Sequence, residues 1–183
     1  MNYNFINMIL SIICILVTAA IACYIPRRIL TNQIFADLVA EYRKADVGMA
    51  VLAIFDFYKN DCAGDVSNIH NMYVQKYKTQ IETPLANGVA PDYDNALHFQ
   101  RRFLSQFYAD IAKLRFDRCP RLRKKDLKYW FTPNETTLLS LLLHMAKPAE
   151  AVFIKVGIPE PPQSDVPMNK LLLKLYDEVK KLK

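Results

Sequence analysis

The sequence predicts an all-α protein in which one N-terminal transmembrane helix precedes a compact multi-helix bundle. Three observations lead to this fold class. The first 26 residues carry no charged side chain, apolar residues elsewhere recur at helical spacings of three and four, and no segment sustains an alternation of period two. The whole chain has 183 residues and a net charge of +6. The part that follows the apolar leader has the length of a single domain.

The leader has the length of a membrane span. The stretch 5–25 is almost wholly apolar, and about 21 residues at ~1.5 Å each cover roughly 31 Å, which matches the hydrocarbon layer of a bilayer. We therefore expect a transmembrane signal anchor over 1–26. Two alternatives remain open: a cleaved signal peptide, although no Lys or Arg precedes the apolar run, and a lipoprotein modified at Cys23, although Ala20 is smaller than the usual residue there.

The charges that flank the leader predict its orientation. Arg27 and Arg28 follow the apolar run, whereas only the α-amino group precedes it. The positive-inside rule then places the N-terminus outside and the C-terminal domain in the cytoplasm, at the plasma (inner) membrane. The domain cysteines Cys62 and Cys119 lack C-x-x-C spacing, so neither a disulfide framework nor a zinc site is predicted.

A helical bundle domain is expected over 27–156. The segment 47–59 is apolar nearly all round, which predicts a central, buried helix. Thr132, Pro133 and Glu135 form a capping-box pattern with proline at the first helical position. The run 138–146 is too short to cross a bilayer and predicts a core helix. The remaining expected segments are a helix over 27–44, a helix over 66–82, a loop over 84–92, a helix from Asp92 or Asp94 to 117 and a short segment over 122–131.

The last unit, 157–183, combines a proline-rich linker with an amphipathic C-terminal helix. Two heptads of a narrow apolar seam are fewer than a coiled coil normally needs. The helix can therefore dock back on the domain or serve as an interaction helix for a partner, and the sequence leaves both open. The seam consists of Met168, Leu172, Leu175, Val179 and Leu182.

Asp56 is the single acid of the apolar 47–59 helix. An ionised, unpaired carboxylate in a protein interior costs several kcal/mol, so a buried Asp56 needs a partner. Arg101 and Arg102 are the candidates, because Arg101 shares a helical stripe with apolar residues and guanidinium binds a carboxylate through two N–H groups. We expect a structural ion pair that joins two core helices, with a ligand-binding role as the alternative.

A basic cluster accounts for the charge of the whole chain. Its eight basic residues face only two acids, Asp117 and Asp126, and eight minus two gives the net +6. Anionic lipid, an acidic protein surface and a merely solvated helix turn are all compatible with it. Nucleic acid is disfavoured, because Tyr129, Trp130 and Phe131 lie at one end instead of between the charges. The cluster consists of Lys113, Arg115, Arg118, Arg121, Arg123, Lys124, Lys125 and Lys128.

Catalytic chemistry is not indicated. The sequence contains no H-E-x-x-H, P-loop, G-x-G-x-x-G or G-x-S-x-G motif. His70, His98 and His144 lie in separate segments. His144 lies inside an apolar run, which predicts a core histidine. We therefore expect no enzyme, no metal and no cofactor.

Two short stretches carry a resemblance. The segments 46–58, with Phe55-Asp56-Phe57-Tyr58, and 97–108, with Gln100-Arg101-Arg102, resemble a family of small, uncharacterised prokaryotic single-span membrane proteins. The resemblance covers about residues 1–155 and implies a single span before a helical domain, with emphasis on Asp56 and the arginine pair. It implies no activity.

Together these features predict a membrane-anchored helical interaction protein. We expect an accessory or scaffold subunit beside a larger membrane-protein partner. The alternative is a peripheral sensor or tether that binds anionic lipid or nucleic acid through the basic cluster.

Overall fold

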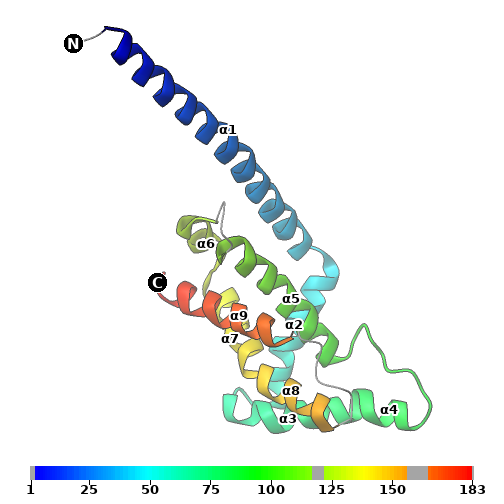
Figure 1. The fold of residues 1–183 in the computed structure, drawn as a ribbon. Coiled ribbons are helices and arrows are strands. Elements are labelled where there is room, and N and C mark those ends of the chain that lie inside the picture. The colour runs from blue at the N-terminus through cyan, green and yellow to red at the C-terminus, as the bar shows by residue number, and fades with distance from the viewer. Residues whose placement is uncertain (1–2, 117–121, 156–164, 183) are drawn as a thin grey trace.

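The structure is a computed structural model, which describes residues 3–116, 122–155 and 165–182. Figure 1 shows one long helix, α1, that leaves a bundle of shorter helices and extends alone to the N-terminus. The described residues form helices and connecting turns, with no strand among them. The all-α fold with an N-terminal apolar helix before a bundle is thus confirmed.

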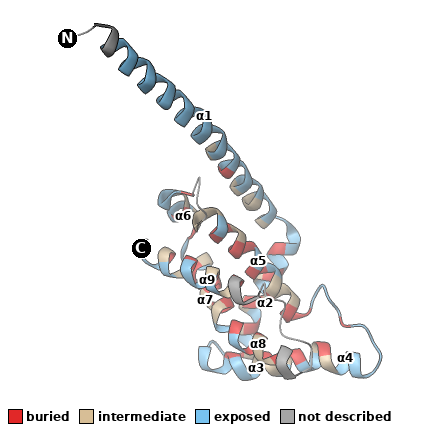
Figure 2. Cartoon of the chain, viewed as in Figure 1, coloured by how far each residue is buried: buried red, intermediate tan, exposed pale blue. Residues whose placement is uncertain are grey.

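Helix α1 (Tyr3–Tyr42) runs without interruption through Pro26. From Ile6 onward it is long and apolar enough to cross a membrane. From Ile6 to Arg27 its side chains are exposed, as the pale blue of Figure 2 shows. The expected boundary after residue 26 is therefore not a helix end. Only the last turns join the bundle, where Phe35, Leu38 and Tyr42 pack against the core.

Helix α2 (Ala45–Asp56) continues into a π-helical turn, Phe57–Asp61. The prediction that this segment is buried all round is wrong. Val47, Ala50 and Ile54 are buried, whereas Met49 and Leu52 are 55% and 69% exposed. The helix covers the bundle with one face, and its apolar residues on the opposite face meet solvent.

The next segment, expected as a single helix, is built from short pieces. Asp65 caps the first by accepting hydrogen bonds from Ser67, and Gly88, with φ of 71°, lies in the turn after the last. The helical pieces are a 3₁₀ turn Val66–Asn68, α3 (Ile69–Tyr77), a π turn Lys78–Glu82 and α4 (Thr83–Ala86).

Helix α5 (Leu97–Phe116) lies at the centre of the bundle, in contact with α1, α2, α3, α7 and α9. Its predicted stripe is confirmed, since Leu104, Tyr108 and Ile111 are fully buried. The helix begins later than expected, because the Asp92 side chain accepts hydrogen bonds from Asp94 and Asn95 and holds them in a turn.

Three helices follow: α6 (Lys124–Trp130), α7 (Pro133–His144) and α8 (Ala146–Lys155). Pro133 opens α7 as predicted, but Thr132 makes no side-chain cap and donates its hydroxyl to the Glu135 carboxylate instead. The apolar run is a core segment, as expected, with Leu139 and Leu142 fully buried. His144, expected in the core, is exposed.

Helix α9 (Asp165–Lys180) completes the bundle by packing against α5 and α7. Its buried side chains belong to the same core as those of the preceding helices. Most of the proline-rich linker lies outside the described residues.

Candidate functional site

The predicted ion pair between Asp56 and the arginines of α5 is not formed. Asp56 lies on the exposed side of α2 and accepts a hydrogen bond from Asn60, one turn along. The reason is helical periodicity: two residues after the buried Ile54 is about 200° around the helix, which points away from the bundle. Within the described part of the chain, no ion pair involves Arg101 or Arg102.

Arg101 is nevertheless 2% exposed, one of the largest fully buried side chains. Its Nε and Nη1 have no hydrogen-bond partner among the described residues, and the neighbouring Ser105 Oγ, one turn later, has none either. A guanidinium without a partner is costly in a protein interior. The sequence thus placed the stem of Arg101 correctly along the apolar stripe but assigned it the wrong partner.

His98 is the core histidine of this protein. It is 3% exposed, and its Nδ1 is hydrogen-bonded to the Tyr73 hydroxyl at 2.8 Å. Burial, followed by the positive charges of Arg101 and Arg102, lowers the pKa of His98 to about 3. The ring is therefore neutral at physiological pH and joins α5 to α3 as a structural element.

The basic cluster divides into residues with different roles. Arg115 is not a surface charge, because it pairs with Glu178 of α9 and donates to the Leu122 carbonyl at 2.7 Å. Lys113 pairs with Asp110, and Arg123 with Asp126. Arg118 and Arg121 lie outside the described residues. Lys124, Lys125 and Lys128 of α6 are exposed and make no ion pair with any described residue.

The seam of the C-terminal helix is occupied by the protein's own core. Met168, Leu172, Leu175 and Val179 are at most 5% exposed, and Leu182 packs against them while half-buried. Docking back on the domain, one of the two open alternatives, is the arrangement found. The seam therefore faces the protein's own helices.

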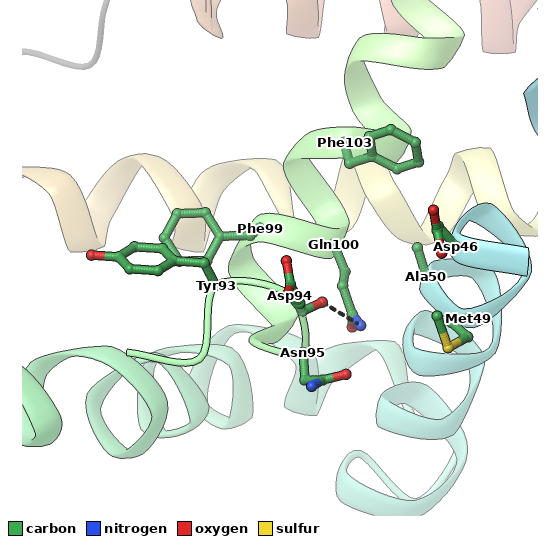
Figure 3. A pocket seen from close by; sticks show the side chains of 9 residues that line it. All are labelled: Asp46, Met49, Ala50, Tyr93, Asp94, Asn95, Phe99, Gln100 and Phe103. Carbon is green, nitrogen blue, oxygen red and sulfur yellow. Dashed lines mark hydrogen bonds between the residues drawn. The ribbon is translucent and has the colours of Figure 1, made fainter. Parts of the chain in front are cut away.

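A pocket that the sequence did not indicate lies between α2, α5 and the turn before α5. Figure 3 shows Asp46 and Met49 on the α2 side, Phe103 on α5, and Tyr93 and Phe99, whose ring planes are tilted by 53°, at the opposite wall. The Tyr93 and Phe99 ring centroids are 5.0 Å apart. The cavity has a volume of about 470 Å³. Its lining residues are Asp46, Met49, Ala50, Tyr93, Asp94, Asn95, Phe99, Gln100 and Phe103.

The lining combines negative charge with aromatic rings. Asp46 and Asp94 are exposed carboxylates, and no ion pair engages either within the described part of the chain. Gln100 donates to the Asp94 carbonyl at 3.2 Å, which fixes the turn against α5. Carboxylates beside ring faces attract ammonium and guanidinium groups through charge and cation–π contacts. The chain has a net charge of +6, so this pocket is a negatively charged site on a positively charged protein.

The sequence predicted Asp94 only as a possible helix start. Lys44, not Asp46, is the N-cap of α2, and Asp46 lies in the first turn, where it also offsets the helix dipole. The available signal was the spacing of Asp46, Met49 and Leu52, which marks a second, solvent-facing stripe on α2. The contribution of residues 93–95 depends on a turn that the sequence does not place.

Metal ligation is not indicated: the described residues contain no group of three or more His, Cys, Asp or Glu side chains suited to an ion. Cys62 is buried, and burial, with the charges of Asp61 and Asp65, raises the pKa of its thiol to about 11. It is therefore not a reactive thiolate at neutral pH. Comparison with protein-family models, curated proteins and solved structures finds no match. The family resemblance of the sequence stays a prediction.

Proposed function

We propose that this protein is a single-span, membrane-anchored docking module, an accessory subunit that holds a basic segment of a larger membrane-protein partner in the α2–α5 pocket. The observation that carries the proposal is the pocket itself, where two free carboxylates and three aromatic rings meet on a basic domain. α1 supplies the membrane anchor, and the domain lies in the cytoplasm.

The surface beside the pocket supports a protein partner more than a small molecule. Met49 and Leu52 continue from the pocket along the exposed face of α2, and Phe103 is 43% exposed on α5. Exposed large apolar side chains that adjoin a pocket are typical of protein interaction sites. A Lys or Arg side chain of the partner fills the pocket, while apolar neighbours cover the α2 face.

A photo-crosslinking experiment in membranes tests this function. With p-benzoylphenylalanine in place of Phe103 in the full chain, we expect one adduct with a membrane protein, at a segment that contains Lys or Arg. Asp46→Asn together with Asp94→Asn should abolish the adduct. Asp56→Asn is the matched control, because it removes an exposed acid of the same helix outside this pocket. An adduct that survives loss of both acids, or one at a segment without basic residues, contradicts the proposal.

The anchor and the orientation have separate tests. The chain should remain in the pellet after carbonate extraction of membranes, because α1 is held by the bilayer core. In intact cells, protease added outside should leave the domain uncleaved. Release by carbonate contradicts the anchor, and digestion from outside contradicts the cytoplasmic placement.

A further inference from the structure

The geometry points to a second contact surface: we propose that α6 lies on the anionic lipid headgroups next to the point where α1 enters the membrane. The surface consists of Lys124, Lys125, Lys128 and Tyr129. This inference rests on the proposed membrane anchor but is independent of the pocket.

The position of α6 in the fold is the first observation. Trp130, its last residue, packs edge-on against Phe35 and Tyr42 of α1, with ring centroids 6.2 and 5.3 Å apart. Figure 1 shows α6 at the end of the bundle nearest the apolar part of α1, whereas α3 and α4 lie at the opposite end. From Trp130 the helix therefore leads back toward the membrane boundary.

That boundary is marked on α1 itself. Arg28 donates a hydrogen bond to the Tyr24 hydroxyl at 2.6 Å, and its guanidinium lies 5.8 Å from the centre of the Tyr24 ring. A tyrosine and arginines at the end of an apolar run are typical of the headgroup region. Arg123 lies near this point: hydrogen bonds to Asp126 raise its pKa, and the phenol of Tyr24 adds to the rise.

The chemistry of the surface is the second observation. Tyr129 is 90% exposed, and it follows the free ammonium groups of Lys124, Lys125 and Lys128 on a single short helix. An exposed aromatic ring among lysines suits a membrane interface, where the ring lies at headgroup level and the ammonium groups meet phosphates. Near an anionic leaflet each lysine adds to the attraction.

A third observation is the charge at the neighbouring end of α9. Lys128 lines a shared cavity with Val179, in the last turn of α9, and with Leu182, two residues after that helix ends, so the ends of α6 and α9 are adjacent. Lys180 and Lys181 are exposed at that end. The positive charges of two helices thus gather at the end of the bundle where the lipid surface is expected. Nucleic acid carries the same phosphate groups, but binding to nucleic acid would not explain why the basic surface lies beside the membrane boundary.

Lipid crosslinking in nanodiscs tests the surface. The full chain, with p-benzoylphenylalanine in place of Tyr129, is reconstituted in neutral phosphatidylcholine or with added phosphatidylglycerol. We expect lipid adducts that increase about fivefold with the anionic lipid and decrease at high salt. The combined variant Lys124→Glu, Lys125→Glu, Lys128→Glu should lose the increase. The matched control carries the probe at Tyr93, which is also exposed but belongs to the connection between α4 and α5. Figure 1 shows α4 at the end of the bundle away from α6, so this probe should give no lipid adduct.

The outcomes separate the alternatives. Equal lipid adducts at positions 129 and 93, or a yield at 129 that ignores lipid charge, overturns the proposal. The proposal is also overturned if an oligonucleotide added to anionic nanodiscs becomes crosslinked at position 129 in place of lipid. Failure of the chain to enter nanodiscs contradicts the anchor instead, and loss of the α2–α5 adduct alone leaves the lipid surface supported. An unchanged circular dichroism spectrum shows that the Glu variant is folded.

Discussion

Arg115 of α5 and Glu178 of α9 form a two-point ion pair in which the Arg115 Nε donates to a Glu178 oxygen at 2.9 Å and Nη2 donates to the other. Both side chains are only 15% exposed. The third nitrogen, Nη1, donates to the Leu122 carbonyl. One guanidinium thus ties together α5, α9 and the entry to α6, so the pair that joins distant helices is not the one expected at Asp56.

Arg115→Gln should lower the free energy of unfolding by about 2–4 kcal/mol, because the substitution leaves a largely buried carboxylate without its partner. Glu178→Gln should have a similar effect, and a double-mutant cycle should show coupling between the two. Urea denaturation of the full chain in detergent micelles measures the difference. Additive effects of the two substitutions would contradict a direct pair.

The pair Lys113–Asp110 is the matched control on the same helix. It is exposed, with side chains 52% and 37% accessible, and its partners are three residues apart. Surface pairs of this kind contribute little after solvent screening. Lys113→Gln should therefore change the free energy of unfolding by less than about 0.5 kcal/mol.

Arg101→Met should stabilise the domain. The buried guanidinium leaves Nε and Nη1 without partners in the described part of the chain, whereas a methionine keeps the apolar stem and removes the charge. We expect a gain of at least about 1 kcal/mol in the free energy of unfolding. Asp56→Asn should leave that energy unchanged, since Asp56 is exposed and has no ionic partner among the described residues. Marked destabilisation by Arg101→Met would mean that the guanidinium binds an anion in solution.

These residues show what the sequence can and cannot predict. The stripe of α5 was readable because Leu104, Tyr108 and Ile111 recur at helical spacing, and Phe103 is the one large apolar side chain of α5 that is exposed. On α2 the apolar residues surround the helix, so periodicity did not reveal which face is buried. Asp56 was therefore placed in the core, and Met49 and Leu52 were not recognised as surface.

Partners distant in the sequence were beyond prediction for a different reason. Glu178 and Arg115 are 63 residues apart, and no local pattern relates them. His98 and His144 both lie on helices with apolar neighbours, yet only His98 is buried, because its face meets Tyr73 of α3. The pocket likewise requires the turn at 93–95 to meet α2, which is a tertiary event. Local spacing predicted helices; the contacts between them decided the site.

Acidification should destabilise the fold through His98. Its pKa is about 3 in the folded protein and 6.5 in a model peptide, so the unfolded chain binds the extra proton between these values. The neutral His98 ring then makes its full contribution to the free energy of unfolding above pH 6.5. This contribution falls as the pH decreases toward 3, by at most about 1.4 kcal/mol per pH unit. Urea midpoints of wild type and His98→Gln between pH 7 and 4.5 measure this slope, and His98→Gln should reduce it.

The exposed histidines provide the control for that titration. His70 and His144 are exposed, and neither is engaged in an ion pair with a described residue. His70→Gln and His144→Gln should therefore keep the wild-type slope. If either one flattened it as much as His98→Gln, the acid sensitivity would not come from the buried ring.

Trp130, the single tryptophan of the chain, should report whether α1 is docked on the bundle. Its ring packs against Phe35 and Tyr42, so Phe35→Ala removes one wall of its site. We expect a red-shifted emission and stronger quenching by acrylamide, because water reaches the indole. Ile34→Ala, one residue earlier and 40% exposed, should leave the emission unchanged. Since the same contact holds α6 beside α1, Phe35→Ala should also reduce the lipid adduct at position 129. If Phe35→Ala left the Trp130 emission unaltered, α1 and the bundle would not be fixed to each other.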